Sequence, residues 1–274
     1  MNLLAFKDVS FTYPNGVQAL KNISFEIAQG EFVALIGRNG SGKTTILQNI
    51  MNLLEPTQGE ISLLTQPIRG RGISYVAESV GYVFQNPSRQ MFLPTVLAEV
   101  AYGPIQQGLS KEAAEKKAKK VLNEVGISHL AAEYPKALSR GEIQRVAIAI
   151  AMALEPKLII LDEPTSGQDG PSTRELRDLL KEMHQSGMTI LLVTHDMELL
   201  AESAVRSIVM AQGQKVFDGL TAELFSECEC EKWGLEFPVW LDIARRIPEL
   251  PPIEVDRPDQ LVQEIFKRQE GGPK

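Results

Sequence analysis

A glycine-rich stretch at residues 37–45 reads GRNGSGKTT and satisfies the pattern G-x-x-x-x-G-K-[ST]. Its glycines let successive backbone N–H groups point at phosphate oxygens, and a helix that begins there adds partial positive charge. Lys43 can neutralise the β- and γ-phosphates of a nucleotide, and the Thr44 hydroxyl can bind Mg²⁺. The stretch predicts a nucleotide site made by Gly37, Arg38, Asn39, Gly40, Ser41, Gly42, Lys43, Thr44 and Thr45.

Two carboxylates stand at the end of another apolar run, KLIILDEP at residues 157–164. At the tip of a strand both side chains can face the phosphates, so Asp162 is expected to partner Mg²⁺ and Glu163 to polarise a water against the γ-phosphate. The run TILLVTHD ends near His195 in the same way. We expect His195 to hydrogen-bond the γ-phosphate and the water held by Glu163.

The elements that must position these groups alternate between strands and helices. Helical patterns over residues 43–54 and 170–187 separate apolar runs, which is typical of an α/β fold with a mostly parallel sheet. Residues 2–14 and 19–27 alternate apolar and polar side chains around PNG and predict an antiparallel hairpin. The predicted buried strands are 32–36, 80–84, 157–162, 189–194 and 206–211.

Two further regions lack strand patterns. A helical insertion is expected at about residues 95–154, and its lysine-rich part is interpreted as a solvated helix face. Residues 228–274 predict a short helical extension with two amphipathic helices around a proline-rich turn.

The composition excludes several classes of protein. The 274 residues carry 35 acidic and 28 basic side chains and a net charge of −7, so nucleic acid is not an expected partner. Cys228 and Cys230 are too few for a structural zinc site, and we expect both to be reduced and solvated. Apolar runs stay short of the ~20 residues of a spanning helix. We therefore expect no direct membrane insertion, and any membrane association through a protein partner.

In this order, the motifs resemble those of the ATP-binding subunits of ABC transporters, over about residues 3–227. GRNGSGKTT resembles the Walker A loop, and LIILDEP resembles Walker B with Glu163 as its catalytic glutamate. Tyr13 in FTYP is similar to the aromatic residue that stacks on adenine. Gln85 in VFQNP is similar to the Q-loop glutamine, which contacts Mg²⁺ and senses a transmembrane partner. Asp169 in SGQD resembles the D-loop aspartate, and His195 the switch histidine.

The resemblance implies a fold and an activity. We expect a P-loop NTPase core with an antiparallel β subdomain and a helical subdomain within residues 1–227, and an ATPase that uses ATP and Mg²⁺. Such subunits close on ATP as dimers, here of two copies or with a second ABC ATPase. Transmembrane subunits are expected to dock near Gln85, with the protein peripheral at the cytoplasmic face of the membrane.

The type of transporter is suggested by the stretch GYVFQNPSRQMF, which resembles that of energy-coupling factor ATPases. That likeness implies the energising subunit of an importer. The alternative is a soluble ABC-type ATPase that acts as an assembly factor without transport.

The family signature LSGGQ is altered here to LSRGE at residues 138–142. In the family this motif and the D-loop act on the partner's ATP, which implies that role for Ser139, Arg140, Gly141, Glu142 and Asp169. Arg140 can add a cationic contact, whereas Glu142 brings negative charge near an anionic ligand. We expect the two substitutions to compensate each other; the alternative is that both are neutral because the backbone binds the phosphate.

Overall fold

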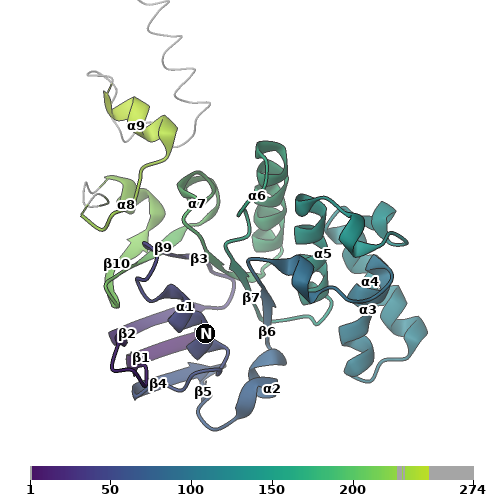
Figure 1. Cartoon of the computed structure of the whole chain (residues 1–274), viewed down its shortest axis with the longest axis horizontal. Coiled ribbons are helices and arrows are strands. Elements are labelled where there is room, and N and C mark those ends of the chain that lie inside the picture. Colours follow the sequence, from purple (N-terminus) through teal and green to yellow (C-terminus); the bar gives the residue numbers. More distant parts are fainter. Residues whose placement is uncertain (1, 227–229, 231, 247–274) are drawn as a thin grey trace, which may run out of the picture.

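The structure is a computed structural model and describes residues 2–226, 230 and 232–246. A six-stranded sheet in the order β10-β9-β3-β8-β7-β6 forms its centre (Figure 1). The strands are β3 (Phe32–Ile36), β6 (Val80–Val83), β7 (Leu158–Asp162), β8 (Thr189–Val193), β9 (Arg206–Ala211) and β10 (Gln214–Leu220). β10 is antiparallel to β9, and the other pairs are parallel. The predicted α/β fold is therefore confirmed.

A second, antiparallel sheet has the order β2-β1-β4-β5. The predicted hairpin forms from β1 (Asn2–Thr12) and β2 (Gln18–Ala28), and Phe6 stacks on Phe25 across it with ring centroids 4.5 Å apart. β4 (Gln58–Leu63) and β5 (Gln66–Pro67) complete the sheet. They were not predicted, because β4 begins with exposed polar residues and β5 is only two residues long.

Alternate residues of the central strands face two different cores. Val33 and Leu35 pack in one core with α1 (Lys43–Ile50) and the antiparallel sheet, whereas Ala34 and Ile36 pack in the other. The second core includes side chains of α5 (Arg140–Met152) and α6 (Gly170–Gln185). Because strand side chains alternate with period two, α1 lies on one face of the sheet, and α5 and α6 lie on the other.

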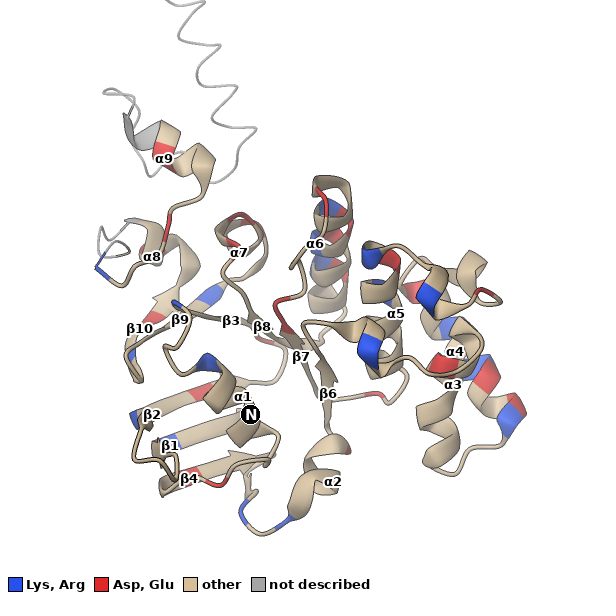
Figure 2. Ribbon diagram, viewed as in Figure 1, with Lys and Arg blue, Asp and Glu red and all other residues tan. Residues whose placement is uncertain are grey.

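The chain between β6 and β7 is mainly helical. It contains α3 (Val96–Gln106), α4 (Lys111–Glu124) and α5, with 3₁₀ turns at Pro87–Gln90, Ser128–Leu130 and Pro135–Ala137. Thr95 and Ser110 cap α3 and α4 by accepting backbone hydrogen bonds. Basic and acidic residues both lie along α4 (Figure 2), where Lys111 pairs with Glu115 and Lys120 with Glu124.

The remaining helices are α2 (Gly72–Ala77), α7 (Met197–Ser203), α8 (Thr221–Ser226) and α9 (Val239–Arg246). Leu235, Trp240 and Leu241 are buried in the same core as α5 and α6, so the described part of the C-terminal segment packs on the main body. The second helix expected there lies outside the described residues. None of the helices in the described ranges combines the length and the apolarity that crossing a bilayer requires.

The expectation of a solvated Cys230 is wrong. Its side chain is fully buried, and its thiol donates to the carbonyl of Leu224 at 3.3 Å. A small apolar thiol suits this core position. Cys228 lies outside the described residues.

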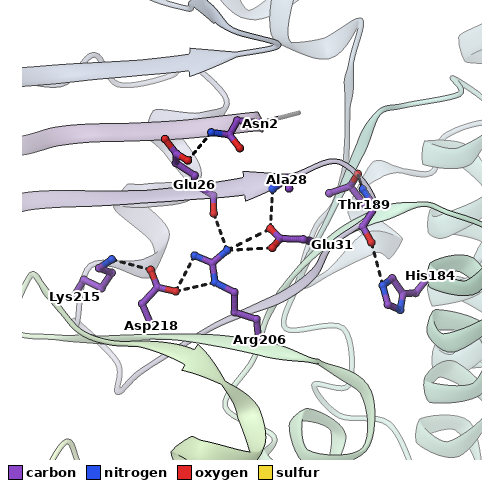
Figure 3. Close-up of polar contacts among 10 residues, drawn as sticks. Asn2, Glu26, Ala28, Glu31, His184, Thr189, Arg206, Lys215 and Asp218 are labelled. Carbon is purple, nitrogen blue, oxygen red and sulfur yellow. Dashed lines mark hydrogen bonds and ion pairs between the residues drawn. The ribbon is translucent and has the colours of Figure 1, made fainter.

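An ionic network joins the two sheets at the amino ends of the central strands (Figure 3). Arg206, the first residue of β9, donates to the carbonyl of Glu26 on β2 and to the carboxylate of Asp218 on β10, both at 2.8 Å. A second pair, with Glu31 just before β3, measures 3.3 Å. The network holds the sheets together at the end away from the phosphate loop, which follows the carboxyl end of β3.

Candidate functional site

The glycine-rich loop connects the carboxyl end of β3 to α1, as the sequence predicts. Gly42 caps α1 with φ of 110°, a left-handed conformation that favours glycine. A Cβ at this position would also lie 2.9 Å from the carbonyl oxygen of Ala19 on β2. Close approach to the antiparallel sheet therefore fixes where the loop turns into the helix.

Lys43 is held inside this loop. Its Nζ donates to the carbonyl of Gly37 at 2.5 Å and to that of Arg38 at 3.1 Å. Burial lowers the pKa of Lys43, and the nearby carboxylates of Glu163 and Asp162 act in the opposite direction. The ammonium thus lies within electrostatic reach of both predicted carboxylates, where it can meet a phosphate.

Asp162 ends β7 and has a partner that the sequence analysis missed. The hydroxyl of Tyr82 donates to Asp162 Oδ2 at 2.9 Å from the neighbouring strand β6. Burial raises the pKa of Asp162, while the Tyr82 hydrogen bond and Lys43 favour its charged form. Only the pairing of β6 with β7 reveals this contact, because nothing in a single strand specifies its register with another.

Glu163 and His195 come together from the ends of β7 and β8. Glu163 Oε2 lies 2.6 Å from His195 Nδ1, and the Glu163 amide donates to the carbonyl of Val193 at 2.8 Å. The backbone of Glu163 has φ of 49°, in the left-handed region, so the extended conformation of β7 ends at Asp162. The Glu163 side chain is 12% exposed and that of His195 is 69% exposed, so the pair reaches from the interior to the surface.

Tyr13 and Gln85 lie in different surroundings. The Tyr13 hydroxyl is 3.1 Å from the Thr45 hydroxyl in the first turn of α1, and its ring meets Phe11 edge to face. This position next to the phosphate loop suits an aromatic nucleotide contact. Gln85 is exposed, two residues beyond the end of β6.

The altered signature forms the N-terminus of α5. Ser139 caps this helix in a capping box with Glu142: Ser139 Oγ accepts from the Glu142 amide at 3.3 Å, and Glu142 Oε2 accepts from the Ser139 amide at 2.8 Å. Arg140 instead donates to the carbonyl of Gly167 at 3.1 Å. Arg140 and Glu142 thus have separate partners, which argues against the expected mutual compensation.

The D-loop lies directly against the signature. Asp169 caps α6 by accepting from the Ser172 amide at 2.9 Å. A Cβ on Gly141 would lie 2.7 Å from Ser172 Oγ, so the small signature glycine permits close approach of the two helix starts. α5 and α6, which begin at these residues, pack on the face of the sheet opposite to α1.

A pocket of about 780 Å³ lies beside the phosphate loop. Its walls include Arg38, His195, Lys232 and Trp233. Gly234 is so close to Arg38 that an added Cβ would lie 2.2 Å from Arg38 Cδ. The C-terminal segment therefore reaches the loop, a contact between distant segments that no sequence pattern predicts.

The chain is similar to several known proteins. Residues 20–166 match the family model described as ABC transporter. The energy-coupling factor transporter ATP-binding protein EcfA of Methanocaldococcus jannaschii is 40% identical over 241 residues, which are 87% of this chain and 86% of that protein. The structure of CbiO1 from Clostridium perfringens, described as part of the ABC transporter complex CbiONQ, matches with a TM-score of 0.80 and 35% identity, over 90% of this chain and 96% of that chain.

A further match is an ATP-binding cassette solved as a post-hydrolysis dimer with ADP and Pi. Its TM-score is 0.70 at 31% identity, over 80% of this chain and 99% of that chain. The family match covers more than half of the chain, and the relatives are matched over most of their length. The chain therefore belongs to the ABC transporter family as an ATP-hydrolysing, ATP-binding subunit, and it is similar to the ATPases of energy-coupling factor transporters.

Proposed function

We propose that the chain energises a membrane importer of the energy-coupling factor type by closing on ATP as a dimer. The observation that supports the proposal is that α1, which begins at Lys43, packs on one face of the sheet, whereas α5 and α6, which begin beside Ser139 and Asp169, pack on the other. We assign these helix starts to two different halves of an ATP site. Lys43 and Glu163, which interact electrostatically, are assigned to one half, and Ser139 and Asp169, which cap α5 and α6, to the other. A second subunit is required to bring the halves together, and closure of that interface can drive a rigid-body motion.

In the first half, Lys43 and the loop amides hold the phosphates of ATP, and Tyr13 stacks on the adenine. Oxygen donors suited to Mg²⁺ are the hydroxyl of Thr44, the carboxylate of Asp162 and the amide oxygen of Gln85. The donor set fits this ion, because it is made of hard oxygens and Asp162 is already oriented by Tyr82. When bound, Mg²⁺ neutralises charge on the phosphate oxygens.

Glu163 orients and deprotonates the water that attacks the γ-phosphate, and His195 positions the carboxylate. With Nδ1 donating to Glu163, the Nε2 atom of His195 is directed away from that carboxylate, and in the doubly protonated ring its N–H can donate to the γ-phosphate. In the second half, Ser139, Arg140, Gly141, Glu142 and Asp169 act on the nucleotide of the partner.

Transmembrane subunits dock on an exposed aromatic surface near Gln85. Phe84, Phe92 and Tyr102 are 49%, 65% and 42% exposed, and the rings of Phe92 and Tyr102 meet edge to face at 5.4 Å. The buried carboxylate of Glu99 accepts hydrogen bonds from the backbone amides of Phe92 and Leu93 and so fixes the backbone that carries the Phe92 ring. Exposed apolar clusters of this kind mark interaction sites. Through such a partner the chain is peripheral at the cytoplasmic face of the membrane.

Affinity purification from native membranes tests the proposal. Transmembrane subunits should co-purify, and identification of every ATPase chain present would distinguish two copies of this chain from a pair with a related ATPase. Phe92→Ala should release the chain from membranes without loss of ATP binding. Val17→Ala is the matched control, since Val17 is also exposed but lies in the hairpin turn. Recovery with soluble proteins alone would favour an assembly factor.

A further inference from the structure

The donors at the start of α5 are already used by a carboxylate of the same chain. Ser139 Oγ donates to Glu142 Oε2 at 2.7 Å, and the Ser139 amide donates to the same oxygen at 2.8 Å. The Glu142 amide in turn donates to Ser139 Oγ at 3.3 Å. The signature serine is thus both donor and acceptor within its own helix.

The position of this carboxylate is one that favours an anion. Unpaired N–H groups and the helix dipole attract negative charge to the first turn of a helix. The hydrogen bonds from Ser139 lower the pKa of Glu142. A lowered pKa keeps the Glu142 side chain charged at every pH above the ordinary value of about 4.3. The carboxylate is therefore an anion at physiological pH.

Arg140 does not neutralise this anion in the structure. Its guanidinium donates to the carbonyl of Gly167, and a Cβ on Gly167 would lie 1.8 Å from Arg140 Nη1. The guanidinium is therefore packed on the D-loop and not on Glu142. A phosphate that approaches Ser139 therefore meets a like charge that Arg140 does not compensate, although His129 lies close enough to Glu142 to interact with it electrostatically. Such juxtaposition of like charges is costly.

We propose that Glu142 is a positioning residue that sets the affinity of this signature for the partner's ATP. Its carboxylate and a γ-phosphate oxygen compete for the same two donors, the hydroxyl and the amide of Ser139. Closure requires Ser139 to exchange one anion for the other. This inference rests on the proposed function, because it requires that the signature acts on a nucleotide held by a second subunit.

The test is ATP-dependent dimerisation in a Glu163→Gln background, in which slow hydrolysis preserves the closed dimer. Glu142→Gln keeps the capping box, which accepts either residue, and removes the charge. Sedimentation should then give a half-dimer protein concentration about tenfold lower than in the Glu163→Gln parent, equivalent to about 1.4 kcal/mol. Because the effect is electrostatic, the difference should narrow as ionic strength is raised.

The matched control is Glu112→Gln. Glu112 is likewise hydrogen-bonded to a capping serine, Ser110, but at the start of α4. This control should leave the half-dimer concentration unchanged, and thermal melting should show that both variants fold. A difference between Glu142→Gln and its parent that salt does not alter would overturn the electrostatic competition.

Equal half-dimer concentrations for Glu142→Gln and its parent would overturn this inference and leave the proposed function intact. Monomers in both proteins at all ATP concentrations would overturn the inference together with closure of a dimer of this chain. A dimer that forms only when Glu142 is neutralised would support both.

Discussion

The phosphate loop and the signature differ in how their polar groups are held. Lys43 is buried and Asp162 is partly buried; Lys43 donates to the carbonyl of Gly37, and Asp162 accepts from Tyr82 on another strand. Ser139 is exposed, and its hydrogen bonds come from a residue three positions along the same helix. The first region is built by the tertiary fold, whereas the second is built by local sequence.

This difference predicts different consequences of substitution. Changes near the phosphate loop should alter nucleotide binding or hydrolysis within one chain, because the groups there lie within reach of one another. Changes in the signature should alter how two chains associate, because we propose that Ser139 binds the ATP of the partner. The following predictions test that division, in order of decreasing effect.

The largest effect is expected for Glu163→Gln. A general base contributes about 10²- to 10⁴-fold to a rate, so steady-state ATP turnover should fall by at least two orders of magnitude. Nucleotide binding to the single chain should be unchanged, because Glu163 does not hold phosphate. Turnover close to that of the parent would show that another group activates the water.

Lys43→Ala should weaken ATP binding to the isolated chain. A charge-assisted hydrogen bond contributes about 1.5–3 kcal/mol, which corresponds to roughly a 10- to 150-fold change in Kd. Isothermal titration calorimetry measures this directly, with Lys7→Ala on the exposed side of β1 as the control. Unaltered affinity would contradict the assignment of this loop as the phosphate site.

Tyr82→Phe isolates the contact that sequence reasoning missed. Hydrogen-bonded partners of metal ligands typically change affinity or activity by 10- to 100-fold, so the Mg²⁺ concentration for half-maximal turnover should rise by about tenfold. The ring packing on Phe84, at 4.4 Å between centroids, should keep the melting temperature unchanged. Tyr75→Phe, on α2, is the control for removal of a phenol hydroxyl, and an equal response of the two variants would refute the role of Tyr82.

Features made by contiguous residues could be predicted from the sequence, whereas contacts between distant segments could not. The phosphate loop and the buried strands were predictable because their residues are contiguous and their apolar runs are strong. The contact of Tyr82 with Asp162, the contact of Arg140 with Gly167 and the burial of Cys230 were not, because each depends on strand register or on packing between distant segments.

The smallest effect is expected for Arg140→Gly, which restores the residue found in the family signature. An exposed hydrogen bond to Gly167 contributes about 0.5–1 kcal/mol, so the half-dimer concentration should change by only about twofold to fivefold. Because Arg140 and Glu142 have separate partners, the double variant should equal the product of the single effects within about 0.5 kcal/mol. A larger coupling energy would restore the mutual compensation expected from sequence and would mean that both side chains meet only when the partner's ATP lies between them.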